Sequence, residues 1–326
     1  MSKTGNDHPT SRSPWLVTGG AGYIGGHVMQ ALSETGIPAV LLDIDAISAQ
    51  KKLTDLSTYE NCNVKDKDSL AQVFSRHSIE GVIHLAALKS VEESQRRKDE
   101  YFQTNVIGTR NILELMIDFD IKKIIFSSTA AVYDAPPDDN VIDEDSPLKP
   151  ISYYGQTKLE AEEIISDYAT KYSLSSIILR YFNVGGSFNP DLKDTSLENL
   201  IPITISKLKS NQTPEIFGDD YETPDGTAIR DYVDVRDVTE AHMRAIQYLK
   251  ENTSSHILNI GTGNGYSVRE IIDITQEVMG THKTALIKGR REGDISAITA
   301  DIARAKNVLD FEAKFGLYDI IQTSIN

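Results

Sequence analysis

Tyr154 and Lys158 stand four residues apart in the run SYYGQTK, where a helix is expected to begin. Side chains at positions i and i+4 share one helix face, so the ammonium can lie close to the phenol. A free phenol has a pKa of about 10 and acts as a base at neutral pH only when a nearby cation stabilises the phenolate. Lys158 can supply that cation. The same pair also occurs on solvated helix faces, so other parts of the sequence have to decide between the two interpretations.

A glycine-rich turn follows the first apolar run of the chain, residues 15–18. Gly19, Gly22 and Gly25 stand at intervals of three. Glycine is required where a turn takes positive φ, where the backbone approaches a pyrophosphate and where a helix packs closely on a strand. Asp43 ends the next apolar run, where a carboxylate can bind an adenosine ribose and would repel a 2′-phosphate. The pattern predicts NAD binding; the simpler interpretation is a structural turn and a surface aspartate.

Three hydroxyl side chains, Ser127, Ser128 and Thr129, follow the apolar run at residues 123–126. Hydroxyls at the end of a sheet strand can bind a substrate hydroxyl and relay its proton, or they can cap the turn that follows. Combined with a bound dinucleotide and with the Tyr154/Lys158 pair, they indicate a site for hydride transfer.

Alternating patterns predict the elements that position these residues. Apolar runs typical of buried strands occupy residues 15–18, 39–42, 81–85, 123–126 and 176–179. Segments with helical spacing occupy residues 28–35, 69–75, 101–119 and 154–172. Strands that alternate with helices predict an α/β fold with a doubly wound parallel sheet, whose ligands bind at the carboxyl ends of the strands.

The same patterns divide the chain into parts. Residues 1–14 are polar and are expected to form a disordered tail, and residues 15–183 are expected to form a Rossmann-type NAD-binding domain. Residues 184–326 are less regular and are expected to form mainly a smaller, interleaved substrate domain. Within it, residues 231–259 are expected to return to the main sheet as a helix over 231–250 and a strand over 256–259.

Composition limits the classes of function. The chain has 326 residues, 40% of them hydrophobic, and a single cysteine, Cys62, which excludes an internal disulfide and a cysteine-rich metal site. No apolar run is long enough to span a membrane, and the first 14 residues do not resemble a secretory signal, so a cytoplasmic location is expected. The net charge of −15 argues against nucleic-acid binding, so a phosphate-bearing ligand must meet locally placed cations.

Longer motifs extend these signals. They are residues 19–25 (GGAGYIG), 82–89 (VIHLAALK), 105–109 (NVIGT), 127–133 (SSTAAVY), 154–158 (YGQTK), 180–183 (RYFN), 226–232 (GTAIRDY) and 290–294 (RREGD). With these motifs, residues 15–315 resemble the extended short-chain dehydrogenases/reductases, and more narrowly the UDP-glucose 4-epimerases among them. The first five motifs are shared by many members of the wider family, whereas the context of Lys89, residues 225–232, and Arg291 with Asp294 indicate the narrower group.

The resemblance implies NAD as the cofactor, a UDP-sugar as the substrate, and a homodimer in which the helices at 101–119 and 154–172 form the interface. It places Tyr154, Lys158 and Thr129 in the catalytic centre. The positions that match the NAD site are Gly19, Gly22, Tyr23, Ile24, Gly25, Asp43, Asn63, Val64, Leu85, Ala86, Ala87, Lys89, Asn105, Tyr154, Lys158 and Phe182. The positions that match the UDP-sugar site are Lys89, Thr129, Tyr154, Asn183, Asn199, Leu200, Phe217, Arg230, Arg291, Asp294 and Ile298.

The activity implied by the resemblance is epimerisation at C4 of a UDP-hexose, UDP-glucose or UDP-galactose, through a transient 4-keto sugar. Tyr154 would act as the base, held as a phenolate by Lys158 and the cationic nicotinamide, which requires its pKa to fall from about 10 to about 7. The sugar would pass hydride to NAD, turn over in the pocket and take hydride back on its other face. Because net redox is zero, NAD would stay bound.

Several features depart from the usual pattern of the narrower group. Asn63 replaces an aspartate that contacts adenine, and an amide can still pair with the base. The segment between Asp43 and Cys62 is shorter, so a more open adenosine pocket is expected. The chain ends at Asn326 without a tryptophan-containing tail, which is expected to weaken packing of the second domain. Ile298 stands where a large tyrosine confines the pocket to plain hexoses, so acceptance of UDP-N-acetylglucosamine is expected unless Ile298 serves only the core.

The same residues also favour or disfavour alternative functions. A nucleotide-sugar 4,6-dehydratase needs an acid and a base beside the strand-end hydroxyl, but Ala130 and Ala131 follow Thr129 here, which disfavours that chemistry. A nucleotide-sugar decarboxylase, or an epimerase for UDP-uronates or UDP-pentoses, stays open. A non-catalytic dinucleotide sensor is the alternative of another class, and it has no need for Thr129, Tyr154 and Lys158 together.

Overall fold

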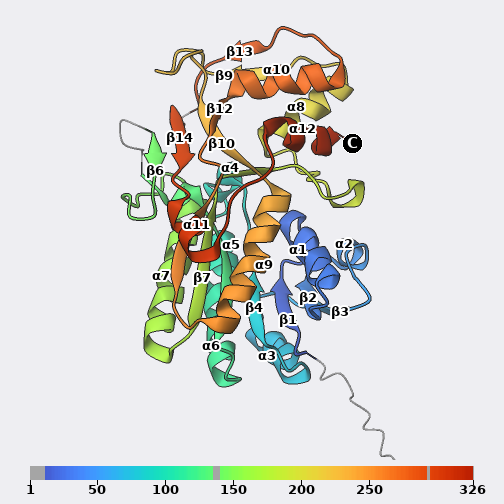
Figure 1. Ribbon diagram of the computed structural model, residues 1–326, viewed down its shortest axis with the longest axis vertical. Helices are drawn as coiled ribbons and strands as arrows, with labels where there is room; N and C mark the ends of the chain where they lie inside the picture. The colour runs from blue at the N-terminus through green and yellow to red at the C-terminus, as the bar shows by residue number, and fades with distance from the viewer. Residues whose placement is uncertain (1–11, 135–139, 292–293, 326) are drawn as a thin grey trace, which may run out of the picture.

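The computed structural model describes residues 12–134, 140–291 and 294–325 (Figure 1). Within these ranges, the larger lobe is built on a seven-stranded sheet in the order β11-β7-β5-β4-β1-β2-β3. The strands are β1 (Trp15–Thr18), β2 (Ala39–Asp43), β3 (Ser57–Asn61), β4 (Gly81–His84), β5 (Lys123–Thr129), β7 (Ser175–Tyr181) and β11 (His256–Ile260). All neighbouring strands run parallel, so the predicted doubly wound α/β class is confirmed.

Burial explains which strands the sequence reveals. β1, β4 and β7 are buried at every position, because helices cover both faces of the sheet. The five apolar runs expected to be strands form β1, β2, β4, β5 and β7. β3 was not predicted, because its sequence, STYEN, is polar and it lies at the edge of the sheet, where burial is only partial.

Helices cover the two faces of the sheet with separate apolar cores. One face carries α1 (Tyr23–Glu34), α9 (Val235–Glu251) and α11 (Ala303–Leu309), and the other carries α3 (Lys67–Arg76), α6 (Gly108–Asp118) and α7 (Tyr153–Tyr172). Trp15 belongs to the first core and Leu16 to the second, as the alternation of side chains along a strand requires. No helix in the described ranges combines the length and the apolar character needed to cross a bilayer.

The prediction of one regular helix over residues 101–119 is wrong for the first part of that range. α5 (Lys98–Tyr101) leads into a π-helical stretch, η1 (Phe102–Ile107), before α6 begins at Gly108. π-helical turns are rare and often occur at functional sites. η1 carries Asn105, whose side chain binds the loop after β4. Other short helices are α2 (Ala46–Gln50), α4 (Val91–Ser94), η2 (Ala130–Val132) and η3 (Pro190–Leu192).

The smaller lobe is built around β10 (Ile229–Asp234). Its other paired strands are β12 (Gly265–Ser267), β14 (Ala297–Ala300), β6 (Val141–Ile142) and β8 (Asn183–Gly185), and β9 (Glu215–Phe217) pairs separately with β13 (Leu286–Lys288). The helices of this lobe are α8 (Leu200–Lys209), α10 (Val268–Met279) and α12 (Leu317–Ile325), drawn at the top of Figure 1. They share an apolar core with Tyr232 of β10.

The chain passes between the lobes several times, at places other than residue 183 and residues 231–259. β6 lies within residues 15–183 but pairs with β14 of the smaller lobe, whereas α11 lies within residues 184–326 but packs on the core of the larger lobe. The helix expected from Asp231 begins only at Val235, because residues 229–234 pair as β10. Asp234 then caps α9 by accepting the amide of Arg236 at 2.8 Å.

Candidate active site

The glycine-rich turn lies between β1 and α1, where the sheet order reverses between β1 and β4, and such a switch point is the ligand crevice of a doubly wound sheet. Gly19 has a φ of +71°, a conformation that favours glycine. A Cβ atom on Gly19 would lie 2.7 Å from the backbone nitrogen of Ala86, just after β4. Gly25 packs against Gly19 and Gly20, so glycines allow the turn, α1 and β4 to approach closely.

The N-terminus of α1 is open to an anion. Its N-cap, Gly22, has no side chain to bind the first amides, and the first turn carries no acidic residue. α10, by comparison, begins with a complete capping box made by Ser267 and Glu270. Unsatisfied first-turn amides and the positive end of a helix dipole suit a pyrophosphate. The residues at this turn therefore fit the dinucleotide expected from the sequence.

Asp43 ends β2 beside the turn and is oriented by backbone amides. Its carboxylate accepts the amide of Ala21 at 3.1 Å and that of Asp45 at 3.0 Å. Lys52, which the sequence pattern does not single out, donates from Nζ to the carbonyls of Ala21 and Gly22 at 2.6 and 2.7 Å. The fold of residues 43–52 therefore places the Lys52 ammonium at the glycine-rich turn.

The other predicted cofactor residues lie around this crevice in different settings. Asn63 accepts the amide of Lys65 at 3.0 Å, and Val64 is buried in the core beside α6. The Tyr23 hydroxyl donates to the carbonyl of Gly186 at 2.7 Å, which ties the start of α1 to the smaller lobe. Ile24, Leu85, Ala86 and Ala87, which also belong to the predicted set, are half-buried.

A buried histidine that the sequence analysis did not assign fixes the shape of the crevice. His84, the polar end of an otherwise apolar strand, bonds through Nδ1 to the Thr18 hydroxyl at 2.7 Å and through Nε2 to the Thr109 hydroxyl at 3.0 Å. Thr109 gives its own proton to the carbonyl of Asn105, so Nε2 of His84 donates and Nδ1 accepts. Burial lowers the pKa of His84 to about 3, so the ring is neutral.

Asn105 supports the loop that follows β4. Its Oδ1 accepts the amide of Leu88 at 2.8 Å, and its Nδ2 donates to the Leu88 carbonyl and to the Thr157 hydroxyl, each at 3.0 Å. The side chain is 2% exposed. Asn105 therefore lies beneath the predicted cofactor wall and joins it to α7.

Tyr154 lies in the first turn of α7, whose N-cap, Ser152, accepts the amide of Gly155 at 3.0 Å. The Tyr154 phenol hydrogen-bonds to the hydroxyl of Thr129 at the end of β5. Thr129 also accepts the amide of Ala131 at 3.1 Å, so it both caps the following turn and holds the tyrosine. Burial raises the pKa of Tyr154 to about 12.

Lys158 lies one turn further along α7. Its Nζ donates to the carbonyl of Ser127 at 2.6 Å and lies 4.5 Å from the centre of the Phe126 ring. Burial lowers the pKa of Lys158 to about 7, and the Glu162 carboxylate opposes that shift. In the protein alone, therefore, the pKa of Tyr154 is not lowered towards the value of about 7 expected for a base.

Residues predicted to hold the UDP group gather on the smaller lobe. Arg230 of β10 forms an ion pair with Asp294. The guanidinium of Arg291 lies over the ring of Phe217, 4.1 Å from its centre. Residues 292–293 of the RREGD motif lie outside the described residues.

Ile298 links this group to the catalytic centre. It lies on β14 in register with Arg230 of β10. Its side chain joins an apolar cluster with Phe182 and with Ala130, the residue that follows Thr129. Ile298 is 8% exposed, so it packs within this cluster as well as standing between the two groups of predicted site residues.

Lys89 connects the two lobes. Its Nζ lies 3.3 Å from the hydroxyl of Ser196, in the segment that leads to α8. Asn199 stands at the N-cap of α8, just before Leu200, but its Nδ2 donates to Asp194 at 2.9 Å instead of its side chain binding the helix amides. The first amides of α8 are therefore left uncapped by a side chain.

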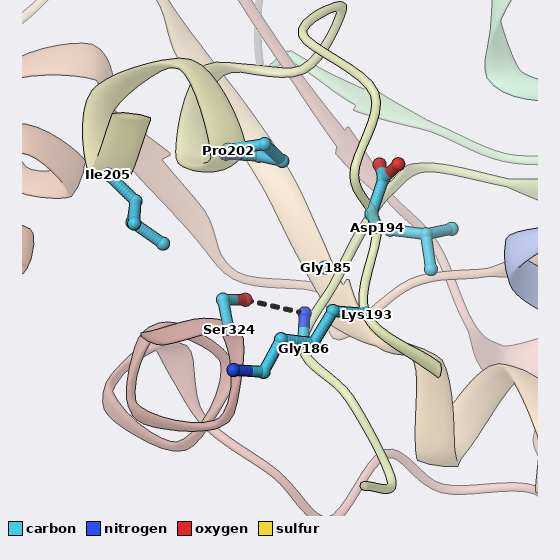
Figure 2. Close-up of a pocket in the computed structure, with 8 residues that line it drawn as sticks. Gly185, Gly186, Lys193, Asp194, Pro202, Ile205 and Ser324 are labelled. Atoms are coloured by element: carbon cyan, nitrogen blue, oxygen red, sulfur yellow. Dashed lines mark hydrogen bonds between the residues drawn. The ribbon is translucent and has the colours of Figure 1, made fainter. Parts of the chain in front are cut away.

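A small hollow lies at the seam between the segment after Asn183, α8 and α12, as Figure 2 shows. Its lining residues are Val184, Gly185, Gly186, Lys193, Asp194, Pro202, Ile205 and Ser324. The Gly186 amide donates to the Ser324 hydroxyl at 3.1 Å, which holds α12 on this segment. Asn183 is exposed and its side chain hydrogen-bonds to the Tyr232 hydroxyl. The hollow contains no catalytic residue, so we assign it a packing role.

Similarity to known proteins extends over most of the chain. Residues 15–261 match the NAD dependent epimerase/dehydratase family. The chain is 40% identical to the UDP-glucose 4-epimerase of Halalkalibacterium halodurans over 305 residues, which cover 92% of this chain and 90% of the relative. It is 38% identical to the UDP-glucose 4-epimerase of Bacillus subtilis, with 95% of each chain covered.

Solved structures show the same similarity. The UDP-glucose-4-epimerase from Stenotrophomonas maltophila, with bound NAD and formylated UDP-arabinopyranose, superposes with a TM-score of 0.91 at 34% identity, over 96% of this chain and 97% of that one. The UDP-Glc/GlcNAc 4-epimerase from Campylobacter jejuni superposes with a TM-score of 0.84 at 33% identity, over 96% and 98% of the two chains.

Proposed function

The chain belongs to the NAD dependent epimerase/dehydratase family, and we propose that it is an NAD-dependent isomerase that interconverts UDP-glucose and UDP-galactose by epimerisation at C4 of the sugar. The observation that carries the proposal is the arrangement at the end of β5. There Tyr154 meets the Thr129 hydroxyl, and Lys158 is anchored one helical turn away on the Ser127 carbonyl. Relatives named for this reaction, which match over at least 90% of their own length, support the assignment.

Tyr154 is the residue that moves the proton in this reaction. It takes the proton from the sugar 4′-oxygen and returns it to the same oxygen after the sugar has turned over, so no net proton leaves the site. Thr129 orients the phenol, and the ammonium of Lys158 favours the phenolate. Bound NAD supplies the hydride acceptor and a positive charge near the phenol.

The crevice between β1 and β4 holds the cofactor in this proposal. The open first turn of α1 suits the pyrophosphate, and Asp43, which the Ala21 amide orients, is placed for the adenosine ribose. Since the sugar recovers the hydride that it gave, the cofactor is unchanged after each turnover. Turnover therefore requires no NAD beyond that carried by the protein.

Arg230 and Arg291 bind the diphosphate of the substrate in this proposal. The net charge of −15 gives no long-range attraction for an anion, so local guanidinium groups must supply it. Phe217 stacks under Arg291 and leaves the N–H edges of that guanidinium available to phosphate oxygens. Arg230 already pairs with Asp294, so the substrate has to share Arg230 with that carboxylate.

We also propose that UDP-N-acetylglucosamine is a substrate. Ile298, which is smaller than a tyrosine, lies in register with Arg230 and belongs to the apolar cluster that contains Phe182. The Campylobacter jejuni relative, named a UDP-Glc/GlcNAc 4-epimerase, supports this range. The opposing interpretation is that Ile298 only packs the core, since it is nearly buried.

A second candidate is epimerisation of UDP-uronates or UDP-pentoses. MoeE5, solved in complex with UDP-glucuronic acid and NAD, superposes with a TM-score of 0.82 at 31% identity over 96% of this chain. The Stenotrophomonas structure holds a formylated UDP-arabinopyranose. These ligands share the UDP group and differ in the sugar, so products have to be identified sugar by sugar.

The deciding experiment is incubation of the purified protein, without added NAD, with UDP-glucose, UDP-N-acetylglucosamine, UDP-xylose and UDP-glucuronic acid in separate reactions. We expect the 4-epimer of UDP-glucose to form and to be separable by chromatography. If no epimer forms from any of the sugars, with or without added NAD, the proposed function is wrong. Epimers from the uronate or the pentose alone would favour the second candidate.

Assembly and location remain proposals based on the sequence. We propose a homodimer through α6 and α7, which lie side by side and carry half-buried apolar groups that include Ile117, Ile164 and Tyr168. Tyr168→Glu is expected to give monomers in analytical ultracentrifugation, and an unchanged mass would contradict this interface.

The single cysteine supports a cytoplasmic location, which cell fractionation would test.

A further inference from the structure

The end of β5 holds one face of α7 at three successive turns. The contacts join Thr129 to Tyr154, the Ser127 carbonyl to Lys158, and the Ser128 hydroxyl to Glu162. Side chains at i, i+4 and i+8 share a helix face, so the three contacts form a row. The proposed reaction uses the first two contacts but leaves the third without a role.

Glu162 is a buried carboxylate whose acceptor positions are filled. The Arg180 Nε donates to both carboxylate oxygens, at 3.1 and 3.2 Å, and Nη2 donates to Oε2 at 2.6 Å. The Ser128 hydroxyl donates to Oε1. The side chains of Arg180 and Glu162 are 1% and 3% exposed. Bidentate pairing and the Ser128 hydroxyl give the buried carboxylate the hydrogen bonds that it loses on removal from water.

Arg180 extends this contact toward the smaller lobe. Its Nη1 donates to the Tyr133 hydroxyl at 2.9 Å, and Tyr133 donates to Asn259 at 2.6 Å. The Nδ2 of Asn259 then donates to the carbonyl of Ile142 in β6 at 2.9 Å. The pair is therefore fixed from both sides and cannot turn without disturbing strands of both lobes.

Ionisable groups from several elements act on Lys158 or contact its neighbours. They are Tyr154 and Glu162 on α7, His84 on β4, Arg180 and Tyr181 on β7, and His242 on α9, which bonds to Tyr181. Burial lowers the pKa of both histidines, to about 3 and about 4, and raises the pKa of both tyrosines. In the described part of the chain, Glu162 is therefore the negative charge that acts on the Lys158 ammonium.

A buried ion pair is a poor source of folding stability, because apolar residues of the same volume often serve the fold as well. We propose that the Glu162–Arg180 pair is a positioning device that keeps the Lys158 ammonium charged and in place beside Tyr154, an inference that rests on the proposed function. Arg180 holds Glu162 in one orientation, and Glu162 supplies the charge. Neither residue has to contact the substrate or the cofactor.

The first test measures the pH dependence of kcat for UDP-glucose. Glu162→Gln keeps the shape but removes the charge, so Lys158 loses its proton at lower pH and the alkaline fall in kcat should begin about one pH unit lower. KM should change less than twofold. Glu162→Asp, which keeps the charge, should recover most of the profile. Asp237→Asn is the control, because it removes another buried carboxylate, which binds the amides of Lys314 and Phe315. It should leave the pH at which kcat begins to fall unchanged.

A double variant separates positioning from folding. Glu162→Leu with Arg180→Met replaces the pair with apolar groups and is expected to fold. Glu162 acts on Lys158 more directly than Arg180 does, so the alkaline fall in kcat should still move to lower pH. A double variant with the wild-type kcat and pH profile would overturn the proposal. If the double variant does not fold, Ser128→Ala, which removes one hydrogen bond to Glu162, is tested instead. A smaller shift of the alkaline fall in kcat to lower pH would support the proposal, and no shift would overturn it.

A second readout does not depend on catalysis. The unfolding free energy of Lys158→Met is compared with that of the wild type across pH, once in the native background and once with Glu162→Gln. The wild type gains stability relative to Lys158→Met as pH rises through the folded-state pKa of Lys158, because the unfolded lysine still binds its proton there. This gain should begin at lower pH with Glu162→Gln. An identical onset would overturn the proposal, whereas a shifted onset without epimerase turnover would reject only the proposed function.

Discussion

Burial shifts Tyr154 and Lys158, the proposed catalytic pair, towards their neutral forms. The pKa of Tyr154 rises to about 12 and that of Lys158 falls to about 7. The charged pair that the proposed reaction needs, a phenolate beside an ammonium, is therefore unfavourable in the protein alone, and bound positive charge would favour it. Under the proposed function, Tyr154 is therefore a weak base until the cofactor is bound.

At the residue scale, the first prediction concerns Tyr154→Phe. Removing the hydroxyl removes the group proposed to carry the proton, so kcat should fall about 10²- to 10⁴-fold. Affinity for UDP, measured by calorimetry, should stay within about threefold, because Arg230 and Arg291, which are proposed to bind the diphosphate, lie on the other lobe. Tyr153→Phe is the matched control, since this neighbouring ring faces Lys98 instead of Thr129. Equal losses for both variants would contradict the assignment of Tyr154.

A second prediction at this scale concerns Ile298. Ile298→Tyr should reduce turnover of UDP-N-acetylglucosamine at least about tenfold while turnover of UDP-glucose changes less, because a pocket discriminates by size through about 1–3 kcal/mol. Ile298→Ala should keep or raise turnover of the N-acetylated sugar. Product separation with both substrates measures the ratio. Negligible turnover of the N-acetylated sugar by wild type and Ile298→Ala alike, with UDP-glucose turnover intact, would refute the proposed substrate range.

Some residues of the candidate site can be predicted from the sequence, whereas the pairing of others is visible only in the structure. Tyr154, Lys158 and Thr129 can be singled out from the sequence, because i,i+4 spacing and the end of an apolar run are local signals. Glu162 and Arg180 lie on different elements and become partners only when α7 packs on β7. Their pairing, and the shifts in pKa that follow from burial, depend on tertiary packing that no local pattern encodes.

Among the helices and strands, too, local sequence patterns predict some elements, whereas others depend on contacts between distant residues. Apolar runs and helical spacing predict the doubly wound sheet, because each pattern reflects burial of one element against its neighbours. β3 is polar and β10 leads directly into α9, so neither has a separate local signal. The π-helical stretch at Asn105 also escapes prediction, because its side chain binds Leu88 and Thr157, which lie far away in the sequence.

At the element scale, we predict the effect of Gly19→Ala. The new methyl group would meet the backbone at Ala86, and φ is positive, so the strand–turn–helix unit must shift. Loss of stability of about 2 kcal/mol or more and at least tenfold weaker NAD binding should follow. Gly36→Ala is a matched control with a similar φ of +68° and open space around it. It should cost about 1 kcal/mol and leave NAD binding unchanged. Denaturant unfolding and NAD titration measure both effects, and equal NAD affinity in the two variants would contradict the prediction.

At the scale of the whole molecule, three buried histidines have to stay neutral, and one of them ties the two lobes together. His27 bonds through Nδ1 to the Tyr23 carbonyl and accepts the Phe188 amide at Nε2, so it joins α1 to the segment after β8. Burial lowers the pKa of His27 and His242 to about 4, and that of His84 to about 3. Protonation of any of the three opposes the packed state.

The molecule should therefore lose stability in mild acid. Below the unfolded-state pKa of about 6.5 the unfolded chain binds protons that the folded chain does not, so the unfolding free energy falls as pH falls towards 4. Each histidine contributes a loss of about 1.4 kcal/mol between pH 8 and pH 5.5, or about 4 kcal/mol for the three. Urea unfolding at a series of pH values measures this slope. His27→Gln should flatten it by about one third, and an unchanged slope would exclude His27 as a contributor.

The repeated crossing of the chain between the lobes also limits how such a molecule can be recombined. A chimera that joins two homologous parents at residue 183 would place β7 from one parent beside β11 from the other, and would pair β6 of the first with β14 of the second. Each exchanged half would bring foreign contacts into both lobes. Cofactor and substrate specificity therefore cannot be exchanged as modules by a single crossover, and a functional shuffle needs several matched breakpoints.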